Sequence, residues 1–285
     1  MNNERKSRYS RHAIAALLAA SSIFAAQSLH AQQTPDRISV PLSDPSRPAT
    51  IHISLVNGGI TVKAGDNTKE VVVEALVRGS RRERGDDSQG MHRVPISSTG
   101  LTVEQENNQV RISTESYARD IDVTITTPRQ ANLHLQAVNG GNIVIEGVDG
   151  EFDINNVNGH IDLNNVSGSA VAHALNGHLI ASFSRVNGKP MAFSSLNGKI
   201  DVTFPADFKA NVTIKCDQGN VYSDFDVALQ NGAPQTVVED SSKNGGKYRV
   251  RIDRAVHGTI NGGGPEYQFT NFQGSVYIRK AGAAH

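Results

Sequence analysis

The 285-residue sequence contains one cysteine, no tryptophan and no excess of either charge. A single cysteine, Cys216, excludes an internal disulfide, and we interpret it as an incidental strand residue. Because 28 Lys and Arg residues balance 28 Asp and Glu residues, no basic surface for nucleic acid is expected. Aromatic residues make up only 5% of the sequence, so aromatic platforms of the kind that bind sugars are scarce.

Residues 1–31 have the layout of a secretory signal peptide. Four basic residues precede an apolar stretch over residues 13–26, and Ala31 offers a small residue for cleavage. This stretch is shorter than the ~20 residues that a membrane span needs, and no second apolar run follows it. Removing it takes away four basic residues and Glu4, which leaves 24 basic and 27 acidic residues and a charge of −3. We therefore expect an exported protein of the periplasm, outer cell surface or extracellular space, with no transmembrane segment in the mature chain.

A short phrase recurs between residues 138 and 204: an apolar residue, then Asn, Asp or Ser, then Gly. Its glycines are Gly140, Gly150, Gly159, Gly168, Gly177, Gly188 and Gly198. Successive glycines are 9–11 residues apart. A fixed period of this kind indicates a repeat fold, and repeat folds usually present an extended surface for binding.

Apolar residues follow each glycine at regular offsets. Phe152 and Ile154 come two and four residues after Gly150, so their side chains point to the same face of a strand. The residues between such pairs, Asp153 and Asp162 among them, are polar and are expected to face water. The pattern predicts short strands, each with one apolar face, joined by left-handed Asn-Gly corners.

Two architectures fit this pattern. Asn-Gly is also typical of antiparallel hairpins, but a meander of such hairpins would leave one wide apolar face uncovered. A coil of two units, 18–21 residues per turn, buries that face across a narrow core and stacks at ~4.8 Å per coil. We therefore predict an all-β, single-domain parallel β-solenoid of 9–11-residue units over residues 38–281. It follows a short linker, 32–37, carries a charged loop insertion at 79–100 and a polar loop at 230–246, and ends in a tail, 282–285.

A two-unit coil places residues 18–21 apart in columns along the stack. His160 and His178 then align, with Lys199 next in the same column. Asn158, Asn176 and Asn197 form a second column, and asparagine side chains can hydrogen-bond along such a stack. These residues are predicted to form the corners and outer wall of a scaffold.

Four aromatic residues near the C-terminus are predicted to cap the open end of the solenoid, which must be covered. They are Tyr267, Phe269, Phe272 and Tyr277.

An upstream strand that ends in Thr127-Pro128, the repeated Asn-Gly-x-Ile phrase and the segment 219–225, Gly-Asn-Val-Tyr-Ser-Asp-Phe, resemble a known family. Together with the Gly-rich return at 259–263, they are similar to the bacterial putative-adhesin β-strand-repeat family, a domain of unknown function, over roughly residues 38–281. The resemblance implies an exported β-solenoid at or outside the cell envelope. It supplies no catalytic residues, so none is carried over.

Two functional hypotheses remain open. The first is a non-enzymatic envelope scaffold or adhesion protein whose partner is an envelope or extracellular protein or glycan. The alternative is a glycan-active β-helix enzyme, either a lyase or a hydrolase, with Asp162 and Asp201 as its paired carboxylates. Two coils separate these residues by ~9.6 Å, at the limit of the ~5–9.5 Å that such pairs require. His160 and His178 lack the third ligand that zinc needs, so we expect no catalytic, cofactor-binding or metal-ligating residues.

Overall fold

The computed structural model describes residues 35–66, 69–78, 99–115, 119–230, 236–240, 248–252 and 255–282. Every regular element in these ranges is a β-strand, which confirms the all-β class. No helix in this part of the sequence is long and apolar enough to span a membrane. The predicted signal peptide, residues 1–31, and most of the charged insertion, residues 79–98, lie outside the described residues.

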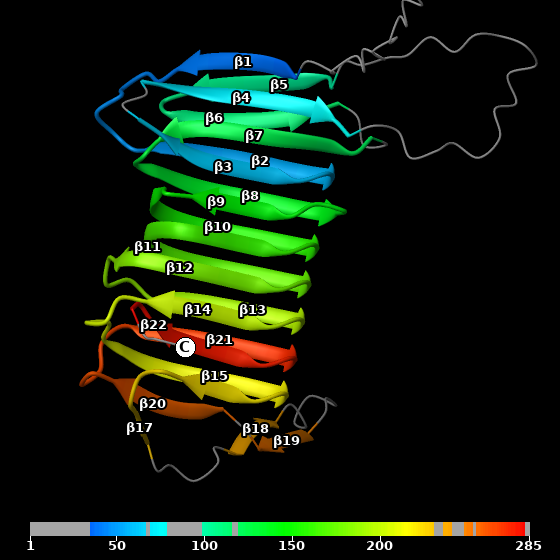
Figure 1. The fold of residues 1–285 in the computed structure, drawn as a ribbon. Helices are drawn as coiled ribbons and strands as arrows, with labels where there is room; N and C mark the ends of the chain where they lie inside the picture. The colour runs from blue at the N-terminus through cyan, green and yellow to red at the C-terminus, as the bar shows by residue number, and fades with distance from the viewer. Residues whose placement is uncertain are drawn as a thin grey trace, which may run out of the picture. The chain divides into compact units, whose positions relative to one another are not determined.

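Within the compact unit 33–285, the strands stack in two columns, which we call side A and side B (Figure 1). Side A runs, in spatial order, through β5 (Leu101–Glu106), β6 (Gln109–Thr114), β2 (Ala49–Asn57), β8 (Ala131–Asn139), β10 (Asp149–Asn158), β11 (Ile161–Asn176), β13 (Met191–Asn197), β21 (Glu266–Gln273), β15 (Ala210–Gln218), β20 (Val256–Ile260) and β17 (Val227–Leu229).

Side B runs through β1 (Asp36–Pro41), β4 (Glu70–Val77), β7 (Ile121–Pro128), β3 (Ile60–Gly65), β9 (Ile143–Glu146), β11, β12 (Leu179–Val186), β14 (Ile200–Phe204), β22 (Val276–Lys280) and β16 (Val221–Ser223). Strand β11 belongs to both sides because it continues around a corner, where Asn165 adopts a left-handed φ of 52°.

The register of the parallel strands pairs residues at the spacing that the sequence predicts. Asn139 pairs with Asn158, Asn158 with Asn176, and Asn176 with Asn197, at separations of 19, 18 and 21 residues. One strand of each coil therefore lies on side A and the next on side B. The alternative antiparallel meander is excluded for this region, because the pairs from β2–β8 to β12–β14 are all parallel.

The two ends of the stack differ from the prediction of parallel strands throughout. Strands β1, β4 and β5 run antiparallel to their neighbours at one end, as does β20 at the other. The sheet is therefore mixed. The segment predicted as a polar loop at 230–246 also contains a strand, β18 (Thr236–Asp240), which pairs with β19 (Tyr248–Ile252).

The spatial order of the coils departs from their order in the sequence at both ends. Coil β2–β3 lies between β6–β7 and β8–β9. Coil β21–β22 lies between β13–β14 and β15–β16, and its orange-red ribbon interrupts the yellow-green run of strands in Figure 1. Each end of the stack therefore holds one coil inserted between two coils that come from another part of the sequence.

The apolar residues after each glycine line the core, as predicted. Phe152, Ile154, Ile161 and Leu163 are all buried. Opposite sides touch through this core, where the Phe193 ring of side A lies 6.4 Å from the Phe204 ring of side B. The core is therefore a thin layer between side A and side B, in which inward residues pack against the other side or the next coil.

The prediction that the C-terminal aromatic residues cap the open end is wrong. Tyr267 and Phe269 are fully buried on β21, inside the inserted coil, while Phe272 points outward. Tyr277 stacks on Tyr222 of the neighbouring coil, with ring centroids 5.0 Å apart. The terminal coil is instead formed by β15 and β16, with β20 and β17 beyond β15.

Candidate functional site

Alternation along the strands of side A turns one set of side chains outward as a row across five neighbouring strands, which we call the histidine row. Its members occupy matched register positions on β5, β6, β2, β8 and β10. They are Glu104, Arg111, His52, His134 and Asp153. Because each inward neighbour is a core residue, the backbone holds the row rigidly.

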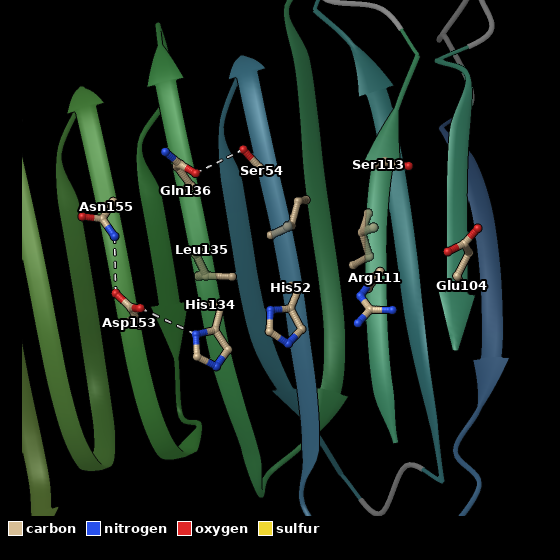
Figure 2. A pocket seen from close by; sticks show the side chains of 12 residues that line it. His52, Ser54, Glu104, Arg111, Ser113, His134, Leu135, Gln136, Asp153 and Asn155 are labelled. Carbon is tan, nitrogen blue, oxygen red and sulfur yellow. Dashed lines mark hydrogen bonds and ion pairs between the residues drawn. The ribbon is translucent and has the colours of Figure 1, made fainter. Parts of the chain in front are cut away.

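The two imidazoles at the centre of the row stack on each other (Figure 2). The rings of His52 and His134 are 4.5 Å apart and 3° from parallel. On the far side of this pair, His134 Nδ1 lies 3.7 Å from Asp153 Oδ2, and Asp153 Oδ1 accepts a hydrogen bond from the Asn155 amide at 3.3 Å. The imidazoles therefore lie between a guanidinium and a carboxylate.

The electrostatics of the row favour neutral His52. Partial burial lowers the pKa of His52, and the positive charges of His134 and Arg111 lower it further. Among the described residues, the hydrogen bond of the Arg111 side chain is a long one, 3.4 Å, to Gln109 Oε1. Its guanidinium keeps donors available for a ligand on the outer surface.

An open depression of about 470 Å³ lies over this row, lined also by Ser54, Ser113 and Gln136. Figure 2 shows these hydroxyl and amide groups on the strands that carry the charged row, with Ser54 donating to Gln136 Oε1 at 3.4 Å. Among the described residues, no three metal-ligating side chains converge. The depression thus offers hydrogen-bond donors and acceptors to a polar ligand.

The model of the family named Toastrack DUF4097 matches residues 33–261. The protein belongs to this family. The resemblance to a putative-adhesin domain of unknown function is thereby confirmed. No functionally curated protein matches the sequence.

Two solved structures are similar to this Toastrack protein. One is a putative cell adhesion protein from Clostridium sporogenes ATCC 15579, 12% identical, with a TM-score of 0.38 over 87% of this protein and all of the other. The other is a putative adhesin from Bacteroides fragilis NCTC 9343, also 12% identical, with a TM-score of 0.30 over 87% of this protein and 97% of the other.

In this Toastrack fold, the predicted column of corner residues performs a structural role. The rings of His160 and His178 stack at 4.9 Å, as predicted. His160 Nδ1 accepts a hydrogen bond from the backbone N–H of His178 at 2.9 Å, and His178 Nδ1 accepts one from Lys199 at 3.0 Å. These imidazoles thus satisfy backbone donors at the corners, where Asn142 does the same for His160.

The two carboxylates of the enzyme hypothesis lie on side B, two strands apart. Ile180 pairs with Asp162 on one side and with Asp201 on the other. Burial raises the pKa of Asp162. Burial acts in the same direction on Asp201, but hydrogen bonds from Arg279 and Lys199 outweigh it and lower the pKa of that carboxyl. Asp201 is therefore committed to two ion pairs, at 2.6 and 3.1 Å.

Sequence reasoning did not find the stacked pair His52 and His134. A signal existed, because each histidine lies five residues before the Asn of an Asn-Gly phrase, Asn57 and Asn139. Aligning the two phrases places the histidines side by side, as the register of β2 and β8 does.

Proposed function

We propose that this protein is an exported cell-envelope protein that acts as a non-enzymatic scaffold or adhesion protein and binds its partner on side A. The observation that supports this most is the histidine row. It places charged and hydrogen-bonding groups along the outside of a rigid sheet, over an open depression rather than an enclosed cavity. A flat, polar and preformed surface of this kind suits an extended partner, such as an envelope protein or glycan.

The proposed architecture is a parallel β-solenoid closed at both ends by antiparallel strands. The stacked coils described above support it, and the sequence of residues 1–31 supports export. If the leader is cleaved as proposed, the mature protein begins at Gln32. Mass spectrometry of the N-terminal peptide from exported protein checks this point, and retention of residues 1–31 in that peptide would contradict it.

The geometry of side B disfavours the alternative glycan-active enzyme. Retaining and inverting glycosidases need one carboxyl that donates a proton and a second that is free to act as nucleophile or base. Asp201 is 8% exposed and held by Arg279 and Lys199, so it faces its ion-pair partners rather than a substrate. Ile180 also stands between Asp201 and Asp162 on the outer surface.

The purified protein, screened against glycan and peptidoglycan fragments and against envelope extract, tests the proposal. Binding and product release are recorded together. A combined His52→Ala, His134→Ala and Arg111→Ala variant is expected to lose binding. The matched control, Lys63→Ala with Glu146→Ala, removes an exposed ion pair on side B and is expected to keep it.

Two results would overturn the proposal. The first is product release that disappears in Asp162→Asn or Asp201→Asn. The second is equal loss of binding in the side A variant and the side B control, since that would show no preference for the histidine row.

A further inference from the structure

The described residues include seven Asn-Gly pairs, and these pairs differ in how tightly the fold restrains them. Asparagine followed by glycine is the sequence most prone to spontaneous deamidation, because glycine leaves the backbone nitrogen after the asparagine unhindered. The pairs begin at Asn57, Asn139, Asn158, Asn176, Asn187, Asn197 and Asn261. We propose that Asn187–Gly188 is a modification site, where the protein deamidates in its folded state while the stacked asparagines are protected.

The reaction needs two movements. The backbone nitrogen of Gly188 loses its proton and attacks Cγ of Asn187. The bond between Cγ and Nδ2 of Asn187 then breaks, ammonia leaves with that proton, and a five-membered succinimide remains. Water opens either C–N bond of the imide and yields aspartate or isoaspartate. The asparagine amide must therefore be free to turn, and the glycine nitrogen must be free to approach it.

The asparagine ladder prevents the first movement. The Asn158 amide donates to Asn139 Oδ1 at 3.1 Å, and the Asn176 amide donates to Asn158 Oδ1 at 3.0 Å. The Asn197 amide donates to Asn176 Oδ1 at 2.8 Å. Asn158 and Asn176 each hold a donor and an acceptor bond, and both must break before Cγ can rotate toward the backbone.

The stacking of coils prevents the second movement at the same corners. A Cβ placed on Gly159 would lie 2.0 Å from Gly141 O, and one on Gly177 would lie 2.0 Å from Gly159 O. The Gly177 nitrogen also donates to Asn197 O at 2.9 Å, and the Gly198 nitrogen to Gln273 O at 2.9 Å. These glycines are wedged against the next coil and cannot swing toward a side chain.

Asn187 lies at the opposite corner, between β12 and β13, where its side chain is outside the asparagine ladder and the following glycine is not wedged against a neighbouring coil. Gly188 is exposed, has φ +75°, and nothing lies within 4 Å of a Cβ built on it. The Asn187 amide donates to Ser169 Oγ at 3.3 Å, a longer bond than any in the asparagine ladder. Asn187 Oδ1 accepts the Lys189 N–H at 3.1 Å, which stabilises the oxygen charge that develops during the attack.

Two other corners are open at glycine but restrained at asparagine. Gly140 and Gly262 also have no atom within 4 Å of a built Cβ. Asn139, however, belongs to the ladder through Asn158, and the Asn261 amide donates to Phe208 O at 2.7 Å. They are expected to react more slowly than Asn187.

Peptide mapping by mass spectrometry tests the proposal on the full-length protein after incubation at mildly alkaline pH. Aspartate and isoaspartate are expected to accumulate at Asn187 at least about tenfold faster than at Asn158, Asn176 or Asn197, because the glycine after each of these is packed against a neighbouring coil and Gly188 is not. In denaturant the rates at all four sites are expected to converge. Gly188→Ala, which meets no neighbour, is expected to slow the reaction at Asn187 alone.

Three results would overturn the proposal. One is a native ladder asparagine that reacts as fast as Asn187, or an Asn187 that does not react. Another is an unchanged ratio of rates in denaturant, because the fold would then play no part. The third is an unchanged rate at Asn187 in Gly188→Ala, because the nitrogen of residue 188 would then not be the nucleophile.

Discussion

The side-chain amide of Asn176 donates to Asn158 Oδ1 at 3.0 Å, although the two residues lie 18 positions apart in the sequence. The same contact recurs one coil later, where Asn197 donates to Asn176. The repeated asparagines at the corners thus form hydrogen bonds between successive coils. Each coil is held to the next by side chains as well as by the backbone ladder.

Replacing Asn176 by Ala should destabilise the fold. The substitution removes two ladder bonds and leaves the partners Asn158 and Asn197 with water, so about 1–2 kcal/mol is expected. Urea unfolding measures the loss as a lower midpoint. Lys209→Ala, at an exposed position, is the control and should change stability by less than about 0.5 kcal/mol. Equal midpoints for the two variants would show that the ladder adds nothing.

Two glycines at opposite corners should respond differently to alanine. A Cβ on Gly177 meets Gly159 O at 2.0 Å, so the coils must separate, and about 3 kcal/mol of stability should be lost. A Cβ on Gly188 meets nothing, and only its left-handed backbone, φ +75°, costs about 1–2 kcal/mol. Unfolding curves in urea compare the two. A larger loss for Gly188→Ala would contradict the close packing at Gly177.

Asp162→Asn and Asp201→Asn should have opposite effects near neutral pH. The pKa of Asp201 is lowered, so its carboxylate stabilises the fold above the unfolded pKa of about 3.9, and that stability is lost as the pH falls through its folded pKa. The pKa of Asp162 is raised by burial, so stability is present at low pH and is lost as the pH rises through its folded pKa.

Asp201→Asn should therefore destabilise the protein by about 1–2 kcal/mol at neutral pH, because Arg279 and Lys199 lose their partner, and by less at acidic pH. Asp162→Asn should be neutral or stabilising at neutral pH. Urea unfolding of both variants and the parent at neutral and acidic pH checks the signs. Losses of the same sign and size would refute the assignment.

Tyr267 places a hydroxyl in the core where it has no hydrogen-bond partner among the described residues. Burial raises the pKa of this phenol to about 12. Tyr267→Phe keeps the ring and removes the unsatisfied group, so stability should rise by about 1 kcal/mol. Above pH ~10 the phenol ionises in the unfolded state but not in the folded state, which lowers the stability of the parent protein. The gain in stability from Tyr267→Phe should therefore increase above this pH. Tyr222→Phe, at an exposed ring, is the control. Destabilisation by Tyr267→Phe would indicate a hidden partner.

The pKa of His52 should lie below the usual 6.5, and NMR titration of its ring protons measures this directly. Since the folded state holds the proton less tightly than the unfolded state, His52 contributes stability at high pH that falls as the pH drops through about 6.5. His134→Gln should raise the pKa of His52 by removing a positive neighbour and part of its cover. A titration midpoint that does not move would show that the stacked rings do not interact.

The period of the glycines predicted the coil because each corner needs the same chemistry. Asn158, Asn176 and Asn197 therefore fall in register at the positions that the spacing indicates. The alternation after each glycine likewise identified Phe152 and Ile161 as core residues. The residue preferences of turns and the alternation of strands were enough to predict this region, because coils that stack on each other here are also consecutive in the sequence.

The inserted coils could not be predicted in this way. Asn57 pairs with Asn139 across 82 residues, and Asn197 pairs with Gln273 across 76. No spacing rule connects such distant strands, so Tyr267 and Phe269 were assigned to a cap although they belong to the core. The stacked pair His52 and His134 also lies on two such strands, and only the equal spacing of the histidines to Asn57 and Asn139 relates them in the sequence.

The insertion of β21–β22 between β13–β14 and β15–β16 sets the order in which the fold can be completed. During synthesis from the N-terminus, β15 has no parallel partner until residues 266–273 have been made, because β15 pairs with β21 rather than with β13. The stack can therefore be completed only after β21 and β22 have been synthesised. A polypeptide interrupted before them would retain the exposed edge of β13–β14, and in this way the topology distinguishes a finished molecule from a fragment.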